Sequence, residues 1–175
     1  MSNSMLNKLK STLSMGARAN KYRVMVDGKG GGPSGESIDT LCKGGAIPAK
    51  TMGTIDIWTQ GRKLPVAGDA QFENTWTLTF YQTQGHELRS QFDAWMNFED
   101  DFDKHSRGAS SHNDYMSDGC KIIQLNTSDN SPTAEYTFYN MFPTSIAAVD
   151  LADESADTIE EFTVDFSYSH WVRTA

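Results

Sequence analysis

Apolar and polar residues alternate with a period of two along several segments of the chain. The clearest example is 75–81, where Trp76, Leu78 and Phe80 alternate with threonines. Because successive side chains of a strand point to opposite faces, this segment is predicted to be a strand with one buried face. The same reasoning predicts strands over 21–27, 38–45, 54–58, 120–125, 134–142 and 160–172.

Glycine, serine and asparagine mark the connections between these strands. The segment 28–37, GKGGGPSGES, is predicted to be a flexible turn that joins the first two strands into a hairpin. TSDNSP at 127–132 is predicted to be a second turn, and 104–119 a polar loop. Strands joined by such turns run antiparallel.

A longer period marks the one substantial helix, which is predicted to begin after Thr83 as its N-cap. Its apolar residues follow one another at spacings of four, three and seven, which places them on one stripe and is typical of core packing. The stripe consists of Leu88, Phe92, Trp95 and Phe102. Acidic residues crowd 99–103, where the helix dipole disfavours negative charge, so the helix is expected to end near residue 100.

These elements together predict a mainly β protein, an antiparallel sandwich or barrel with one helix packed on it. The 175 residues suffice for one domain. Residues 1–20 are polar with scattered Leu and Met and are predicted to form a flexible arm with about one helical turn, while 21–175 form the β domain. No run of eighteen apolar residues occurs, so no membrane insertion is expected.

The net charge of −8 argues against a general nucleic-acid binder, which would carry a basic stripe. The charge is also unevenly distributed. Residues 1–29 hold six Lys or Arg and one acid, whereas 143–172 hold seven acids and no Lys or Arg. Opposite charge in two regions suits head-to-tail assembly, but a basic tail and solvated acidic loops would look the same.

Signs of enzyme chemistry are weak. GGGPSG at 30–35 matches G-x-G-x-x-G, but a strand is expected after it where the nucleotide fingerprint needs a helix, so a turn is the favoured interpretation. His105 and His112 share a loop with Asp103 and Asp114, and solvated histidines are favoured over a metal site there. The chain is therefore predicted to be no enzyme and to hold no cofactor or metal.

The two cysteines, Cys42 and Cys120, lie far apart in the sequence. A disulfide between them is possible, but two buried thiols in a reducing compartment are the favoured interpretation.

A mixed basic and apolar stretch precedes the strand at 75–81. Pro65 permits an edge strand but not a central one, and a stretch of this kind outside the core is expected to meet a partner surface. Its residues are Gly61, Arg62, Lys63, Leu64, Pro65, Val66, Ala67, Gly68 and Asp69.

Several long motifs, in this order, resemble the tail tube proteins of contractile-tailed bacteriophages. They are GARANKYRVMV at 16–26, CKGGAIPA at 42–49, GRKLPVAGDAQFENTWTLTF at 61–80, HELRSQFDAWMN at 86–97 and NMFPTSIAAVDLADESADTIEEFTVDFSYSHW at 140–171. The resemblance covers most of the chain. Relatives of this family form type VI secretion tubes and the tubes of extracellular contractile injection particles.

The resemblance implies a structural subunit whose hexameric rings stack into a hollow tube that conducts DNA into the host. It implies a tail-tube barrel that shares strands between subunits, tail sheath and baseplate or terminator proteins as partners, and a place in the virion tail after assembly in the host cytoplasm. By the same likeness, 61–69 belongs to a long hairpin that reaches an adjacent ring, and residues 1–20 form a second tie between subunits.

The lumen of such a tube needs a face that does not bind DNA phosphates. Two polar faces are candidates, although ordinary solvent faces have the same pattern. One consists of Thr75, Thr77 and Thr79, and the other of Thr163, Asp165, Ser167 and Ser169.

The charge asymmetry suggests a contact between neighbours in which the arm meets an acidic segment. Lys8, Lys10 and Arg18 would lie near Asp153, Glu154 and Asp157 of the next subunit. Two other functions stay open at this point: a secretion or injection tube that carries protein effectors, and a monomeric ligand-binding β-sandwich.

Overall fold

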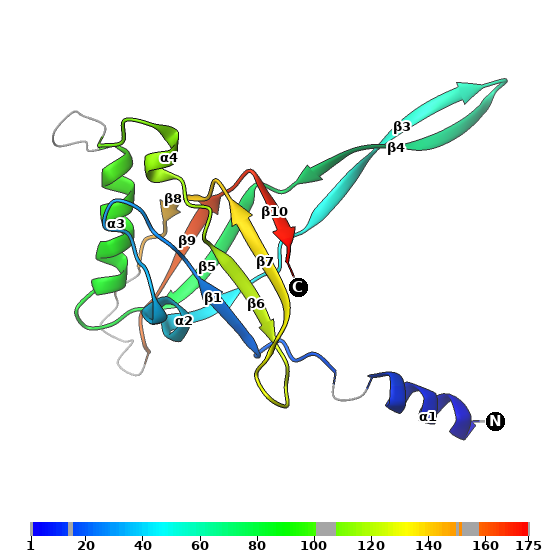
Figure 1. Ribbon diagram of the computed structural model, residues 1–175, viewed down its shortest axis with the longest axis horizontal. Coiled ribbons are helices and arrows are strands. Elements are labelled where there is room, and N and C mark those ends of the chain that lie inside the picture. Colours follow the sequence, from blue (N-terminus) through cyan, green and yellow to red (C-terminus); the bar gives the residue numbers. More distant parts are fainter. Residues whose placement is uncertain (1, 14–15, 101–107, 150, 152–157, 175) are drawn as a thin grey trace.

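The computed structural model describes residues 2–13, 16–100, 108–149, 151 and 158–174 (Figure 1). Its four helices within these ranges are α1 (Ser2–Leu13), α2 (Glu36–Leu41), α3 (Glu87–Glu99) and α4 (His112–Tyr115). Its strands are β1 (Tyr22–Met25), β2 (Cys42–Gly45), β3 (Lys50–Thr59), β4 (Arg62–Phe72), β5 (Thr75–Tyr81), β6 (Lys121–Leu125), β7 (Pro132–Tyr139), β8 (Phe142–Ile146), β9 (Glu161–Ser167) and β10 (His170–Arg173).

The strands form two four-stranded sheets and one long hairpin. The sheets have the orders β1-β6-β7-β10 and β2-β5-β9-β8, and the hairpin consists of β3 and β4. Every pairing is antiparallel. The predicted class, mainly β with antiparallel strands and a packed helix, is therefore confirmed.

The two sheets face each other across an aromatic core. Trp76 of β5 stacks on Phe138 of β7 with ring centroids 4.2 Å apart, which joins the two sheets directly. Farther along, α3 takes the place of the second sheet: Phe92 contacts the rings of Phe80 and Phe162 on the β5–β9 surface. One face of this sheet is thus covered partly by strands and partly by the helix.

Two segments that were predicted as single strands each cross from one sheet to the other. The segment 134–142 divides into β7 and β8, and 160–172 into β9 and β10. The first break falls at Asn140, whose positive φ of 53° no strand allows and whose backbone N–H binds the carboxylate of Asp118 at 2.7 Å. Alternation continues through such a corner, so the sequence pattern does not reveal it.

The predicted hairpin between the first two strands is wrong. β1 pairs with β6 and β2 pairs with β5, and α2 occupies the first half of the segment predicted as the second strand. The helix places Ile38 in the core, while Asp39 accepts a hydrogen bond from the backbone N–H of Val24 at 3.1 Å. Burial of one residue and the bond to the edge of β1 outweigh the local strand pattern.

The glycine-rich segment after β1 is a tight loop packed on α3. The backbone N–H of Gly28 bonds to the Pro33 carbonyl at 2.8 Å. A Cβ at Gly30, where φ is +60°, would meet the Phe98 ring at 2.1 Å, so only glycine fits there. The glycines thus allow close packing on a helix, which accounts for them without a nucleotide.

The helix stripe is confirmed, but the predicted N-cap is wrong. Leu88, Phe92 and Trp95 are buried, whereas Phe102 lies outside the described residues. α3 begins at Glu87 after His86, and the hydroxyl of Thr83 has no hydrogen-bond partner. The end of α3 at Glu99 agrees with the predicted stop near residue 100.

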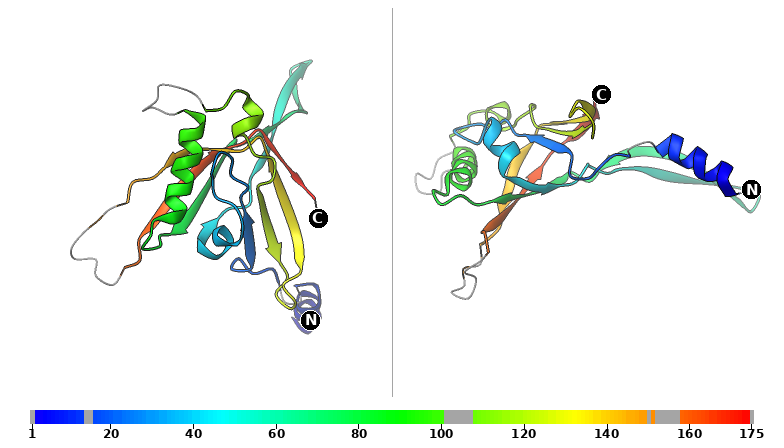
Figure 2. Two further views of the ribbon diagram at one scale, coloured as in Figure 1. Left: turned by 60° about the vertical axis from the view of Figure 1, so that its left-hand side comes forward. Right: turned by 90° about the horizontal axis from the view of Figure 1, so that it is seen from below.

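The N-terminal region contains more helix than the single turn predicted. α1 has 12 residues and projects beyond the two sheets, as does the β3–β4 hairpin (Figures 1 and 2). The predicted loop at 104–119 includes α4, and its first part lies outside the described residues. None of the helices described here has the length and apolar character needed to cross a membrane.

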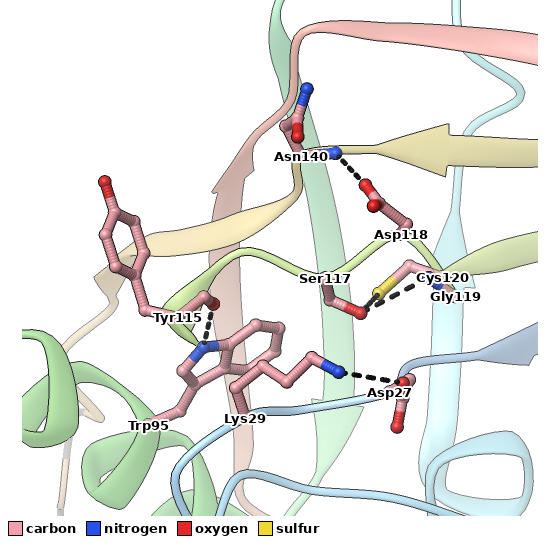
Figure 3. Close-up of polar contacts among 9 residues, drawn as sticks. All are labelled: Asp27, Lys29, Trp95, Tyr115, Ser117, Asp118, Gly119, Cys120 and Asn140. Carbon is pink, nitrogen blue, oxygen red and sulfur yellow. Dashed lines mark hydrogen bonds and ion pairs between the residues drawn. The ribbon is translucent and has the colours of Figure 1, made fainter. Parts of the chain in front are cut away.

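A network of hydrogen bonds connects the end of α4 and the segment after it to the core (Figure 3). The indole N–H of Trp95 donates to the Tyr115 carbonyl at 2.8 Å. The Ser117 hydroxyl accepts from the backbone N–H of Gly119 and lies 3.5 Å from the thiol of Cys120. Each buried polar group in this network has a hydrogen-bond partner, so the network has a structural role.

We expect Trp95→Ala to lower the free energy of unfolding by roughly 3–5 kcal/mol, the cost of truncating a large buried aromatic residue. Trp95 is fully buried and would also leave the Tyr115 carbonyl without its donor. Chemical denaturation of the subunit measures this. Trp58→Ala is the matched control because Trp58 is 68% exposed, and it should leave stability near that of the wild type. Equal stability of both variants and the wild type would contradict the packing described.

Both thiols are free, and we expect them to resist alkylation in the folded subunit. Burial raises the pKa of Cys42 and of Cys120 to about 11 each. At about pH 8, roughly one in a thousand molecules would then carry the reactive thiolate at each cysteine. In an unfolded chain this fraction is far larger. Mass spectrometry after iodoacetamide treatment, with and without concentrated guanidinium, measures the difference. Rapid labelling of the folded protein would show that the thiols are not held protonated.

Candidate assembly surfaces

The β3–β4 hairpin projects from the body with most of its residues exposed, and it contains all of the stretch 61–69. Its strands pair from Lys50↔Phe72 to Thr59↔Arg62. The turn is formed by Gln60 and Gly61, with φ values of 50° and 75°, and two positive φ values are the mark of a type I′ turn. The hairpin therefore projects as a twisted two-stranded ribbon beyond the body (Figure 1).

One face of this ribbon is aliphatic. Ile55 lies opposite Val66, and Ile57 lies opposite Leu64. All four side chains stand on the same face because strand residues two apart share a face. They are 40–60% exposed, so the face has no cover within the subunit. We call these four residues the aliphatic face; a contiguous patch of this kind marks an interaction site.

The opposite face of the ribbon is mixed: Thr54, Asp56 and Lys63 are polar, whereas Trp58, Pro65 and Ala67 are apolar. Lys63 and Asp56 form an ion pair of 2.7 Å on it. Trp58 pairs with Lys63 across the strands and is 68% exposed. Pro65 lies opposite Asp56 and lacks an N–H group, which suits the free edges of a two-stranded ribbon.

Aromatic contacts hold the base of the hairpin to the body. Phe72, the last residue of β4, contacts the Trp171 ring at 5.9 Å in an edge-to-face arrangement. The Trp171 indole donates to the Ala49 carbonyl at 3.3 Å, immediately before β3 begins. The ribbon is therefore anchored at one end and unsupported at the other.

The sequence predicts a strand at 54–58, which lies within β3, but it does not predict that this strand is the outgoing half of the hairpin. It therefore assigns no role to Ile55, Ile57 or Trp58. The available signal was the Gln60-Gly61 pair between two alternating runs. A two-residue turn with glycine between such runs indicates a hairpin.

The β2-β5-β9-β8 sheet has a polar face opposite its core face. Thr75 lies opposite Ser167, Thr77 opposite Asp165 and Thr79 opposite Thr163. The two polar faces predicted separately are therefore one continuous surface. Ser169 is the exception, because it lies beyond β9 and donates to the Tyr139 carbonyl at 3.2 Å.

Asp165 organises this polar face. Its carboxylate accepts hydrogen bonds from Thr77 at 2.6 Å and from Ser145 of β8 at 2.8 Å, so it links three neighbouring strands. At one end of the face, the ion pair with Glu161 raises the pKa of Lys43 on β2. The surface carries hydroxyl groups, and its charged side chains are mainly hydrogen-bonded or ion-paired. Such a surface suits contact with water.

Both outer strands of this sheet have an open edge. In the part of the chain that the structure describes, β2 pairs only with β5 and β8 only with β9. Open edges offer unpaired backbone groups that a strand from another chain can complete.

The arm carries exposed apolar and basic side chains. Lys8, Lys10 and Arg18 are exposed. So are Met5, Leu6, Leu9 and Leu13, at 50–82%. The acidic residues predicted to meet the arm, Asp153, Glu154 and Asp157, lie outside the described residues, so this pairing stays a prediction.

The loop considered as a weak metal site is only partly described. Within the described ranges, no three His, Cys, Asp or Glu side chains form a group that could hold a metal ion. His112 bonds to the Tyr115 hydroxyl at 2.7 Å, and Asp114 accepts two backbone N–H groups at the start of α4. His105 and Asp103, the other members of the weakly considered metal site, lie outside the described residues.

The sequence and the fold both match known proteins. Residues 10–174 match the family model described as phage tail tube protein. The chain is 24% identical over 155 residues to the tail tube protein gp19 of Enterobacteria phage T4, covering 89% of this chain and 90% of that protein. It is 21% identical over 169 residues to the tail tube protein of Serratia phage KSP90, covering 93% of each.

The fold resembles a chain in the cryo-EM structure of an extracellular contractile injection system, the PVC sheath–tube complex in its extended state. The TM-score is 0.62 at 16% identity, over 94% of this chain and 97% of that one.

Proposed function

The chain belongs to the phage tail tube protein family, and we propose that it forms hexameric rings that stack into a hollow tube conducting DNA. It is a structural tube subunit and not an enzyme. The observation that carries the proposal is a sheet with two open edges and one polar face, next to a projecting hairpin with an uncovered aliphatic face.

Ring closure follows from the open edges. If β8 of one subunit pairs with β2 of the next, each contact joins a β8 edge to a β2 edge. A closed ring then leaves no edge of the β2-β5-β9-β8 sheet exposed. The same surface repeats around the ring, so each subunit gives and receives one contact. Six copies would then share one continuous β-barrel.

The polar face centred on Asp165 is proposed to line the channel. Its threonines and serines offer hydroxyl groups, and its carboxylates repel phosphate. DNA would pass without being held, because tight binding needs Lys or Arg to displace counterions from phosphates. The net charge of −8 acts in the same direction.

Stacking is proposed to bury the aliphatic face of the hairpin against the adjacent ring. Residues Gly61, Arg62, Lys63, Leu64, Pro65, Val66, Ala67, Gly68 and Asp69 would then belong to the contact between rings. Permanent interfaces of this type usually bury more than about 2,000 Å² and are strongly apolar, which suits the exposed isoleucines and leucine.

Residues 1–20 are proposed to act as an arm attached to a β domain of residues 21–175. Lys8, Lys10 and Arg18 would steer a subunit toward Asp153, Glu154 and Asp157 of its neighbour. Exposed ion pairs contribute only about 0–1 kcal/mol each, so their main effect is on the rate of association.

The proposed partners are tail sheath, baseplate and terminator proteins, and the proposed location is the virion tail, assembled in the host cytoplasm. The sheath–tube complex whose fold this chain resembles supports a sheathed tube. That complex comes from an injection system, so a tube that carries protein effectors is the second candidate. Genes for a capsid and portal beside this one would favour the phage.

Negative-stain microscopy of the purified protein tests the proposal: rings or hollow tubes are expected. Replacing Leu64 and Val66 with Asp should leave a folded subunit but prevent stacking, because it puts charge on the aliphatic face. Gln91→Asp with Asn97→Asp is the matched control, since both residues are exposed on α3. Unfolding of the Leu64/Val66 variant would place these residues in the core, and normal tubes from it would exclude them from the ring contact.

Assembly is expected to slow as salt rises, while finished tubes persist because apolar burial holds them. The screening length falls from about 10 Å at 0.1 M salt to about 3 Å at 1 M, which weakens steering by the arm. Deleting residues 1–18 should slow assembly and flatten its salt dependence. Light scattering against time at several salt concentrations measures both. Identical rates and salt responses for the truncated and full-length proteins would remove the electrostatic role of the arm.

A further inference from the structure

Trp58 stands alone near the tip of the hairpin. It lies two residues before the turn, on the face of the ribbon opposite the aliphatic face, and is 68% exposed. Its indole makes no hydrogen bond or ring contact within the described part of the chain, whereas Trp76, Trp95 and Trp171 each donate to a carbonyl. An isolated tryptophan on a projecting tip is typical of a residue that anchors a protein contact.

A pocket of suitable size and chemistry lies beside the base of the same hairpin. Its volume is about 210 Å³, and its apolar walls come from Tyr22, Ile47, Ile122 and Tyr136. Lys21 and Gln124 also line it, and the side-chain amide of Gln124 makes no hydrogen bond with the described residues. Two tyrosine rings suit edge-to-face contact with an indole, and the free amide oxygen could accept from the indole N–H.

The pocket is out of reach of Trp58 in the same subunit. Trp58 is eight residues beyond Lys50, where β3 begins, and a strand rises about 3.3 Å per residue. Trp58 therefore lies roughly 26 Å along the strand from the base of the hairpin, while Ile47 of the pocket is three residues before that base. If Trp58 fills this pocket, it must therefore be the Trp58 of another copy of the chain.

We propose that Trp58 inserts into this pocket of a subunit in the adjacent ring. The inference rests on the proposed function, because it requires stacked rings. A tip that meets the base region of the next copy is a head-to-tail contact, which repeats without limit along an axis. The inserted indole would fix how far the hairpin reaches into the adjacent ring and in which direction it points. Burial of the aliphatic face adds stability but is less specific.

A double-mutant cycle tests the contact. Trp58→Ala and Ile47→Asp are each expected to raise the lowest protein concentration that gives sedimentable tubes by at least about tenfold, as for other anchor residues. The double variant should be no worse than the more severe single variant, because both changes remove one contact. Thr54→Ala, on the same face of the ribbon but nearer its base, is the control and should assemble normally.

Both changed residues are exposed in the single subunit, so the variants are expected to fold, and thermal unfolding checks this. Effects that multiply in the double variant would overturn the proposal. The proposal would also be overturned if Ile47→Asp impaired assembly and Trp58→Ala did not. That result would mean that another segment, such as the arm, occupies the pocket. Wild-type protein that forms no rings or tubes would instead refute the proposed function, and this inference with it.

Cross-linking gives a second, independent measurement. A Trp58→Cys variant and an Ile47→Cys variant, both with Cys42→Ser, are mixed, assembled and oxidised. A disulfide-linked dimer of the two variants is expected in the sedimented tubes. Ser128→Cys replaces Ile47→Cys as the control, because Ser128 is exposed in the turn between β6 and β7. Tubes that give no dimer, or as much dimer with the control, would overturn the proposal.

Discussion

The pairing of β5 with β9 is the constraint on which the rest of the subunit depends. Seven residue pairs hold the two strands in register, from Thr75↔Ser167 to Tyr81↔Glu161. On one face the register aligns Trp76 with Phe166 and Phe80 with Phe162. On the other face it aligns threonines with Thr163, Asp165 and Ser167. A slip of one residue would exchange the core and the polar surface, so both depend on the same set of hydrogen bonds.

Much of this arrangement could be predicted from local pattern, because alternation and helical periodicity report which side of an element is buried. The strand 75–81 and the stripe of Leu88, Phe92 and Trp95 were found in this way. Strand pairing could not be found so directly. The hairpin assumed between β1 and β2 failed because their partners, β6 and β5, lie far away in the sequence.

Part of the candidate site was also accessible from sequence. The stretch 61–69 stood out because Pro65 and the basic residues do not suit a core strand, and the family resemblance gave it a hairpin. Trp58 and the isoleucines of β3 did not stand out, since an apolar alternating segment reads as an ordinary buried strand. Exposure decides their role, and it depends on the ribbon projecting from the body, which no local pattern encodes.

The projecting hairpin has a consequence for any fibre built head to tail from this subunit. The two ends of such a fibre differ: one end exposes the hairpin tips, and the other exposes the surfaces that would contact the hairpins of the next subunits. The two termini differ in shape and in apolar exposure, so one capping protein cannot fit both. A protein that starts the fibre must imitate one surface, and a protein that stops it must imitate the other.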